Sequence, residues 1–326
     1  MDISIVIPLL NEEESLPELE QWIRTVMERE GFSYEIIFVD DGSTDTSWKI
    51  IKEMIAQRET VKGIKFRRNY GKSAALNTGF GMAKGEIVFT MDADLQDSPE
   101  ELPEMRRMIL EEDFDIVSGW KRKRFDPLSK TIPTKLYNGV TRWMSGIKLN
   151  DMNCGLKAYK KEVVKSIEVY GEMHRYIPVI AKWSGFRKVG EKVVQHQARK
   201  YGVTKFGLSR FVKGPLDLLS IMFVGKFSKQ PMHFFGTIGG FVFFVGFLLF
   251  FILGINKVYH LAIGETAKNL ADISWFYVGL TAMIIGTMLF VTGFLAELVS
   301  RNAPHRNIYL IEEEIGWEQS KKELIR

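Results

Sequence analysis

Hydrophobic runs of strand length alternate with helix-like segments through the first part of the chain. Four nearly continuous apolar runs have the length of strands buried on both faces, and they occupy residues 3–9, 34–39, 61–66 and 86–91. Segments whose apolar side chains recur with the period of an amphipathic helix lie between them, at residues 12–28, 46–57 and 73–83. This alternation predicts an α/β domain with a mostly parallel sheet covered on both faces.

Two long segments without Asp, Glu, Lys or Arg follow, at residues 233–255 and 275–296. As a helix, the first would extend about 35 Å, enough to cross a hydrocarbon core of about 30 Å. We therefore expect two transmembrane helices, with two core helices of a soluble protein as the alternative. Glycines at 236, 239, 240, 279 and 286 would allow close helix packing.

The flanks of these segments predict the topology and the domain boundaries. Basic residues precede the first span and follow the second, so the positive-inside rule places both termini in the cytoplasm. Residues 207–230 mix apolar with basic side chains, which favours interfacial helices over an amphipathic helix on the globular domain. The expected parts are a catalytic domain (1–206), interfacial helices (207–230), a two-helix anchor (231–299) and a cytoplasmic tail (300–326).

Charge and cysteine content narrow the class of protein. The formal net charge of +4 is too small to indicate nucleic-acid binding. Basic residues gather at 121–124 and 187–229, next to the apolar segments, which fits an anionic membrane surface. A single cysteine, Cys154, excludes an intramolecular disulfide and fits a reducing compartment. The first residues show no signal-peptide pattern.

Polar residues follow three of the predicted strands, where ligands of open α/β sheets bind. They are Asn11 and Glu12, then Asp40 and Asp41, then Asp92 and Asp94. Carboxylates gathered at one edge repel one another unless a cation or a hydrogen-bonding ligand compensates. No glycine-rich dinucleotide loop or P-loop follows any strand, so this edge predicts a different kind of ligand.

The turn after the fourth strand suggests metal chemistry. Two carboxylates two residues apart, Asp92 and Asp94, supply hard oxygen ligands for Mg2+ or Mn2+ bridging a diphosphate, and Gln96 adds a neutral oxygen. Such a pair is also found in ordinary solvated turns. Asp97 or Ser98 has the alternative role of capping the helix that starts near Pro99.

Several motifs together resemble glycosyltransferase family 2, and within it the dolichol-phosphate mannose synthase and polyprenyl-phosphate glucosyltransferase group. They are Val6-Ile7-Pro8 with Asn11-Glu12, Val39-Asp40-Asp41-Gly42-Ser43-x-Asp45, Asn69-Tyr70-Gly71-Lys72, Asp92-x-Asp94-Leu95-Gln96-x-x-Pro99, Ser118-Gly119-Trp120, Asp151-x-x-Cys154-Gly155-Leu156-Lys157-Ala158-Tyr159 and Gly171-Glu172-x-His174-Arg175-Tyr176-Ile177-Pro178. With the two apolar segments, the resemblance covers essentially the whole chain.

The resemblance implies a GT-A (Rossmann-like) fold and assigns the site residues. The nucleotide-sugar would lie among Pro8, Asn11, Glu12, Asp40, Asp41, Lys72, Asp92 and Ala93. The metal ligands would be Asp92, Asp94 and Gln96, and the catalytic residues Asp94 and Asp151, the latter as base, acceptor-orienting residue or structural carboxylate. The phosphates would be bound by Lys121, Arg122, His174, Arg175, Arg199 and Lys205.

Two of these assignments stay open. Many relatives carry an Arg shortly after the Ser-Gly pair, whereas this chain reads Trp120-Lys121-Arg122, so the phosphate role falls to either Lys121 or Arg122. His174 is either a phosphate ligand or a structural histidine.

The expected activity is a metal-dependent, inverting transfer of a hexose to a polyprenyl phosphate such as undecaprenyl phosphate. By resemblance, the donor is a UDP-sugar with glucose as first choice, the setting is the cytoplasmic face of a bacterial inner membrane, and the assembly is a homotetramer. GDP-mannose, another UDP-sugar and a non-catalytic membrane scaffold are alternatives. A processive polysaccharide synthase is disfavoured, because the chain lacks a Gln-x-x-Arg-Trp motif.

Overall fold

The computed structural model divides the chain into two units, each considered by itself. One unit comprises Met1–Asp217 with Asn307–Arg326, and the other comprises Leu218–Arg306. The residues that the structure describes are 1–122, 139, 141–142, 146–198, 200–201, 231–266, 268–301 and 311–315. The predicted interfacial helices at 207–230 lie outside these residues.

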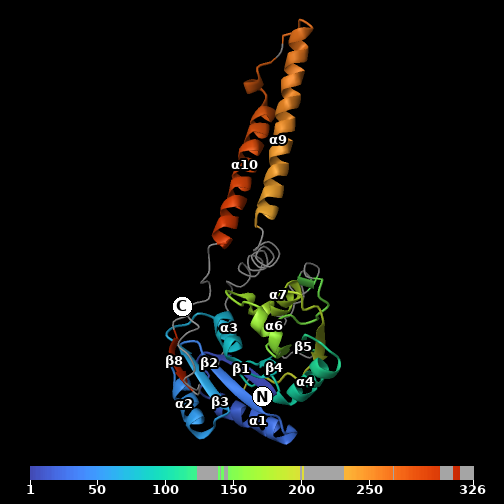
Figure 1. Cartoon of the computed structure of the whole chain (residues 1–326). Helices are drawn as coiled ribbons and strands as arrows, with labels where there is room; N and C mark the ends of the chain where they lie inside the picture. Colours follow the sequence, from blue (N-terminus) through green and yellow to red (C-terminus); the bar gives the residue numbers. More distant parts are fainter. Residues whose placement is uncertain are drawn as a thin grey trace. The chain divides into compact units, whose positions relative to one another are not determined.

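The first unit is built on the four strands that the hydrophobic pattern predicts (Figure 1). They are β1 (Ile3–Leu9), β2 (Tyr34–Asp40), β3 (Val61–Phe66) and β4 (Ile87–Thr90). All three pairings among them are parallel, in the spatial order β4-β1-β2-β3. Side chains on both faces of these strands are buried, which explains why their sequences are apolar without alternation. The predicted parallel sheet is confirmed.

Four further strands extend this sheet at both ends. They are β5 (Ile116–Trp120), β6 (Lys157–Lys160), β7 (Val189–Val193) and β8 (Ile311–Ile315), and the full order is β7-β5-β6-β4-β1-β2-β3-β8. β6 runs antiparallel between β4 and β5, and β8 runs antiparallel to β3. Residues 311–315 of the segment predicted as a cytoplasmic tail (300–326) therefore pair with the sheet of the first unit.

Helices cover the two faces of the sheet. The main ones are α1 (Leu16–Glu30), α2 (Ser47–Gln57), α3 (Lys72–Met82) and α4 (Leu102–Glu111), and the shorter ones are η1 (Pro99–Glu101), α6 (Lys161–Ser166), η2 (Met173–Arg175) and α7 (Ile177–Trp183). α1 begins later than predicted because residues 12–15 form a turn closed by the Ser15 N–H and hydroxyl on the Glu12 carbonyl.

The hydrophobic core lies mainly between the sheet and α1, α2 and α4. Ile3, Ile5 and Ile7 of β1 are fully buried there, together with apolar side chains of these three helices. α3 packs on β1 and β2 through Gly79, where an added Cβ would collide with Val6. This close approach holds α3 directly against the sheet.

The second unit is a hairpin of two long helices, α9 (Pro231–Ala262) and α10 (Ser274–Arg301), with the short η3 (Leu270–Asp272) before α10 (Figure 1). A Cβ on Gly239 would lie 2.6 Å from the Gly286 carbonyl oxygen, and one on Gly246 would lie 2.6 Å from that of Gly279. Glycine is therefore needed at this contact, and predicted close packing is found within the hairpin.

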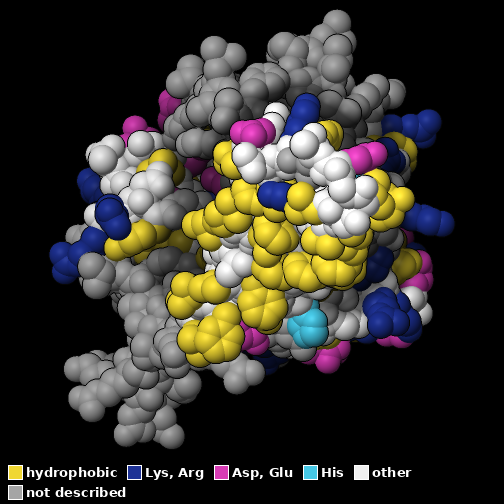
Figure 2. All heavy atoms as spheres, turned by 90° about the horizontal axis from the view of Figure 1, so that it is seen from above, with side chains coloured by type: hydrophobic (Ala, Val, Ile, Leu, Met, Phe, Trp, Pro, Cys, Tyr) yellow, Lys and Arg dark blue, Asp and Glu magenta, His cyan; other side chains and the backbone are white. Residues whose placement is uncertain are grey.

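The hairpin presents hydrophobic side chains outward (Figure 2). Segments Pro231–Ala262 and Ser274–Val299 are long and apolar enough to cross a membrane. In the most apolar 18-residue stretch of each, only 11% and 17% of the residues, respectively, are buried. Core helices of a soluble protein would bury this surface, so the predicted membrane association accounts better for it.

Candidate nucleotide-sugar site at the carboxyl edge of the sheet

The turn that follows β1 is hydrogen-bonded to the turn that follows β2. Asn11 adopts a left-handed conformation with φ of 54°. Its backbone N–H donates to Oγ of Ser43 at 2.9 Å, and its side-chain oxygen accepts the backbone N–H of Thr44 at 2.8 Å. Asparagine tolerates this backbone region better than most residues. The turns after β1 and β2 are thus joined into one surface.

Asp40 and Asp41 are buried beneath this surface. Oδ1 of Asp40 accepts the Ser43 N–H at 2.7 Å, while Asp41 accepts the N–H groups of Tyr70 and Gly71 at 2.7 and 2.9 Å. Burial raises the pKa of both carboxyls, against the opposing effect of these hydrogen bonds. Both predicted nucleotide-site residues therefore shape loops from below, and Oδ2 of Asp40 has no partner among the described residues.

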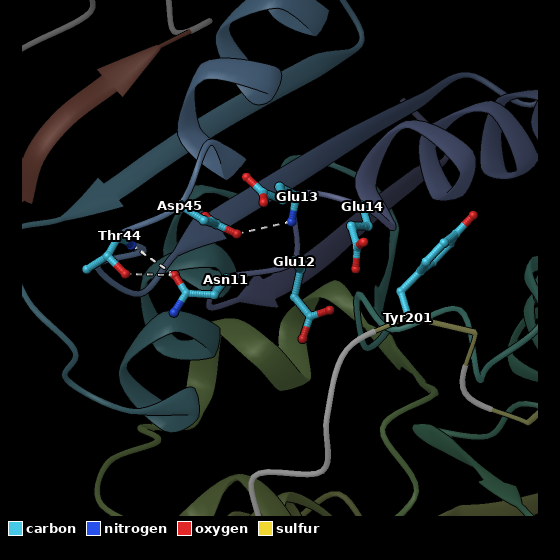
Figure 3. A pocket seen from close by; sticks show the side chains of 7 residues that line it. All are labelled: Asn11, Glu12, Glu13, Glu14, Thr44, Asp45 and Tyr201. Carbon is cyan, nitrogen blue, oxygen red and sulfur yellow. Dashed lines mark hydrogen bonds between the residues drawn. The ribbon is translucent and has the colours of Figure 1, made fainter.

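A pocket of about 320 Å³ opens over these turns (Figure 3). It is lined by Asn11, Glu12, Glu13, Glu14, Thr44, Asp45 and Tyr201. Asp45 accepts the backbone N–H of Glu13 at 3.3 Å, which joins the two acidic segments that line the pocket. Pro8, another predicted contact, lies in β1 and is not among the residues that line the pocket.

Tyr201 is a pocket residue that the sequence analysis does not identify. Its hydroxyl donates to Glu18 of α1 at 3.3 Å, and Lys200 contacts the same carboxylate at 2.7 Å. The ammonium group of Lys200 also lies 5.2 Å from the centre of the Tyr201 ring. The predicted phosphate ligands Arg199 and Lys205, on either side of Lys200 and Tyr201 in the sequence, lie outside the described residues.

The turn after β4 carries the Asp-x-Asp pair. Asp92 forms an ion pair with Nζ of Lys72, from the first turn of α3, and its side chain is 33% exposed. Burial disfavours the charge on Asp92, but Lys72 and Lys121 overcome it and lower the pKa to about 2. The carboxylate is therefore ionised at neutral pH. Leu95 has a φ of 59°, an uncommon conformation for leucine that tightens the turn.

The other acidic and polar groups of this turn face different partners. Oδ1 of Asp94 accepts the Gln96 N–H at 3.3 Å, and Ala93 between the two aspartates is buried. The Gln96 carbonyl accepts the N–H of Gln197 at 3.0 Å, which ties the turn to the segment after β7. Ser98, not Asp97, caps η1 by accepting the Glu100 N–H at 3.3 Å.

This turn offers the oxygen donors that a divalent cation prefers, since it supplies two carboxylates and one amide. Within the described ranges, no three His, Cys, Asp or Glu side chains form a group able to hold a metal ion. The ammonium of Lys72 nevertheless rests against Asp92. The site is thus one where a cation is stabilised, and a metal there would need further ligands from a substrate.

Lys121 lies under the turn as the partner of Asp97. Their 2.7 Å ion pair is nearly buried, with the Asp97 side chain inaccessible and that of Lys121 12% exposed. Burial opposes the charge of Lys121, but Asp97 raises its pKa above the usual range. Arg122 is exposed, and its guanidinium lies 5.9 Å from the centre of the Trp120 ring. Of the two candidates for the phosphate role, only Arg122 is exposed.

The loop before β6 packs directly on Asp92. A Cβ on Gly155 would lie 2.7 Å from Cγ of Asp92, and the Gly155 carbonyl accepts the Thr90 hydroxyl at 2.8 Å. Lys157 is buried next to this contact and donates to the Cys154 carbonyl. Burial lowers the pKa of Lys157. The sequence analysis assigns no site role to these residues, because only the antiparallel pairing of β4 with β6 brings them to the turn.

Asp151 is 1% exposed and is held at both its backbone and its side chain. Its N–H donates to Glu191 at 2.9 Å, and its Oδ1 accepts the N–H of Asn153 at 3.1 Å. Glu191 also binds the backbone and side chain of Asn150, each at 2.7 Å. Strand β7 thereby fixes the loop that carries Asp151.

His174 approaches the start of α3, where Ser73 contacts both its backbone and its ring. Burial, followed by the charges of Lys72 and Arg175, keeps the pKa of His174 well below its usual value. Arg175 is paired with Glu172 at 3.4 Å. Of the predicted phosphate ligands in η2, the structure therefore brings His174 close to Lys72 and Asp92.

Comparison with known proteins identifies this arrangement. A family described as "Glycosyl transferase family 2" matches residues 4–167. The chain is 32% identical over 304 residues to a dodecaprenyl-phosphate galacturonate synthase of Rhizobium johnstonii, covering 92% of this chain and 88% of the relative. It is 34% identical over 303 residues to an undecaprenyl-phosphate 4-deoxy-4-formamido-L-arabinose transferase of Shewanella sediminis, covering 92% and 87%.

A solved structure supports the fold. Glucosyl-3-phosphoglycerate synthase from Mycobacterium tuberculosis, in complex with Mn2+, UDP-glucose and glycerol 3-phosphate, aligns with a TM-score of 0.51 and 18% identity. The alignment covers 69% of this chain and 79% of the other. At that identity the likeness concerns the fold, and the predicted GT-A class is confirmed.

Proposed function

The chain belongs to glycosyl transferase family 2, and from this premise we propose that it transfers a sugar from a nucleotide-sugar to a polyprenyl phosphate. Relatives named for dodecaprenyl and undecaprenyl phosphate align with 92% of the chain. A lipid acceptor also explains why the chain carries two membrane-length helices with exposed apolar side chains. Undecaprenyl phosphate is our proposed acceptor.

One observation carries the proposal: an acidic pocket and a cation-stabilising turn share the carboxyl edge of one sheet. Glu12 and Asn11 of the pocket suit the hydroxyl groups of a ribose, and the Tyr201 ring offers a stacking surface for a base. Asp40 and Asp41 act from below by holding the loops that shape this pocket. The nucleoside would occupy the pocket, with its diphosphate directed to the Asp92 turn.

Asp92 and Asp94, with the side-chain oxygen of Gln96, would hold Mg2+ or Mn2+, which neutralises the charge developing on the leaving diphosphate. Lys72 contributes a second positive charge at the same place. His174, Arg122 and Arg175 are our further proposed phosphate contacts, with Arg199 and Lys205 on the segment leading to the hairpin. Lys121 supports the turn through Asp97.

The acceptor needs little help from a base, because a lipid phosphate is already an anion at neutral pH. Positioning its oxygen in line with the anomeric carbon then accounts for most of the protein's contribution. We assign Asp151 to this orienting role, since its loop is fixed by Glu191. A single displacement of this kind inverts the anomeric configuration.

The sugar is the least constrained part of the proposal. The resemblance of the motifs favours glucose from UDP-glucose, whereas the two relatives are named for galacturonate and 4-deoxy-4-formamido-L-arabinose. Each is compatible with a uridine donor in the same pocket, so the donor has to be identified by assay. GDP-mannose serves as the test of base selectivity.

Further proposals concern the setting of the enzyme. Both termini and the first unit would face the cytoplasm of a bacterial cell, with interfacial helices at 207–230 lying on the inner membrane. A homotetramer is our proposed assembly.

The test is a transfer assay on membrane fractions with radiolabelled sugars. A panel of UDP-glucose, UDP-galacturonate, UDP-4-deoxy-4-formamido-L-arabinose and GDP-mannose is supplied with undecaprenyl phosphate, with and without EDTA. We expect one UDP-sugar to label a lipid that partitions into organic solvent, with the label lost in EDTA. Asp94→Ala should reduce the labelling by at least about a hundredfold.

Other outcomes would point elsewhere. Transfer that persists at the normal rate in Asp94→Ala would refute the metal assignment. Absence of transfer from every donor, in membranes where the protein is folded, would favour a membrane scaffold.

A further inference from the structure

Ser73 and His174 form two contacts across a long sequence separation. The backbone N–H of His174 donates to Oγ of Ser73 at 3.0 Å, and Nδ1 of the ring lies 3.1 Å from the same oxygen. Ser73 stands in the first turn of α3, next to Lys72, and is 1% exposed. The histidine ring is therefore held at the end of α3 that faces the Asp92 turn.

These two contacts favour one of the two neutral tautomers of the ring. Oγ of Ser73 already accepts the backbone N–H of His174, and its own hydroxyl hydrogen needs an acceptor. In the part of the chain that the structure describes, the acceptor placed for it is Nδ1. A neutral ring that accepts at Nδ1 carries its hydrogen on Nε2.

The surroundings of His174 favour a neutral ring. Burial disfavours the imidazolium, and the positive charges of Lys72, Arg175 and Lys157 disfavour it further, with Asp92 opposing them. Nε2 makes no hydrogen bond to any residue of the described ranges. A neutral N–H donor that is bound by none of the described residues, among cationic side chains, is suited to an anionic oxygen.

We infer that Ser73 is a positioning residue that fixes His174 with its Nε2–H directed to a phosphate oxygen of a substrate. The inference rests on the proposed function, because that function supplies the phosphates. Two sources share this chemistry, the diphosphate of the nucleotide-sugar and the phosphate of the lipid acceptor. Ser73 acts through His174 and touches neither substrate.

Steady-state kinetics of Ser73→Ala test the inference on the full-length protein in membranes. Without the hydroxyl, the ring is free to place its hydrogen on Nδ1, so kcat/KM should fall about tenfold, the usual size of one hydrogen bond to a charged group. A rise in KM for the nucleotide-sugar alone assigns the bond to the diphosphate, and a rise for the lipid alone assigns it to the acceptor.

Asn77→Ala is the matched control. Asn77 lies one turn further along α3, and its side chain accepts the Val169 N–H at 3.0 Å. The substitution thus removes another tether between α3 and the segment before η2 without touching His174. The thermal unfolding temperature should fall by a similar amount in both variants, whereas only Ser73→Ala should lose transfer activity. Equal losses of activity would overturn the inference.

A double-mutant comparison separates positioning from structure. Gln at position 174 retains a neutral N–H donor that needs no fixed tautomer. Ser73→Ala should therefore cost about tenfold in the wild-type background and nearly nothing in a His174→Gln background. The same loss in both backgrounds would overturn the positioning role.

Nitrogen NMR of the histidine ring gives a readout that does not need activity. The chain has five histidines, and His174→Gln identifies the signal of His174 by its disappearance. We expect the Nε2–H tautomer in the wild type and a shift toward Nδ1–H in Ser73→Ala. A wild-type ring protonated at Nδ1 would overturn the inference even where transfer is normal. Failure of the wild type to transfer any sugar would instead refute the proposed function.

Discussion

The two edges of the parallel sheet both carry carboxylates, but they differ in how completely the protein satisfies them. At the amino edge, Glu35 of β2 accepts Nζ of Lys62 and the hydroxyl of Ser4, each at 2.6 Å, and the N–H of Lys84 at 2.7 Å. Burial opposes the charge of Glu35, yet these bonds hold its pKa below the usual value. Both carboxylate oxygens of Glu35 are thus satisfied by neighbouring residues.

At the carboxyl edge, the carboxylates of Asp40 and Asp92 are less completely satisfied by the protein. Burial raises the pKa of Asp40, whose Oδ2 has no partner among the described residues, and Asp92 stays one-third exposed against Lys72. Buried polar groups in native proteins are normally satisfied, so each exception calls for a physical explanation, and a ligand site is one. The difference suggests that the amino edge stabilises the fold, whereas the carboxyl edge is kept for a ligand.

The largest effect is expected at the amino edge. Lys62→Met removes the cation and leaves Glu35 buried without its charged partner, which should lower the free energy of unfolding by about 3–5 kcal/mol. Urea or thermal unfolding measures it, and transfer per folded molecule should be unchanged at low temperature. Lys49→Met is the control, because Lys49 is 74% exposed and 4.0 Å from Glu53. A loss of activity without a loss of stability would contradict this division between the edges.

The opposite pattern is expected for Asp92→Asn. Removing one carboxylate from the turn should slow sugar transfer by about 10²–10³-fold, because a preorganised charge is lost where the diphosphate develops its own. The stability should change little, since Asp92 is partly exposed and its ion-pair partner, Lys72, is itself partly exposed. Asp113→Asn is the control, an exposed carboxylate paired with Lys160 at 2.7 Å. If both variants transferred equally well, Asp92 would have no catalytic part.

The sequence predicts the central strands well because both faces of each strand are buried. β1 matches its predicted residues 3–9, and β4 differs from residues 86–91 only at its ends. The strands from β5 onward are not predicted, because each is short and its place depends on long-range pairing. β6 inserts between β4 and β5 in the antiparallel sense, which no local pattern records.

The same division holds for the candidate site. The carboxylates that directly follow buried strands, such as Asp92, are identified from the sequence because position along the chain predicts their edge of the sheet. Ser73, Gly155 and Tyr201 are missed, since each joins the site through a contact with a distant segment. The 101-residue separation between Ser73 and His174 is an example. For Gly155, the sequence offers one indication, because this glycine belongs to one of the motifs that resemble glycosyltransferase family 2.

A smaller effect on both stability and transfer is expected from Gly155→Ala. The new Cβ would lie 2.7 Å from Cγ of Asp92, so either the carboxylate or the loop before β6 has to shift. Overpacking of this kind costs about 1–3 kcal/mol, and we expect transfer to fall about tenfold. Gly81→Ala on α3 is the control, because an added Cβ there meets nothing within 4 Å. Normal transfer by Gly155→Ala would show that the position of Asp92 tolerates displacement.

The smallest effect is expected at the rim of the carboxyl edge. Tyr201→Ala removes an aromatic wall of the pocket, and since base–aromatic stacking contributes about 1–3 kcal/mol, the KM for the nucleotide-sugar should rise about tenfold. Tyr201→Phe keeps the ring and loses only the 3.3 Å hydrogen bond to Glu18, so it should behave almost as the wild type. The KM for the lipid acceptor should not change in either variant. If Tyr201→Ala raised the acceptor KM instead, the ring would border the lipid phosphate, and the pocket at the ends of β1 and β2 would have to be reassigned from nucleoside to acceptor.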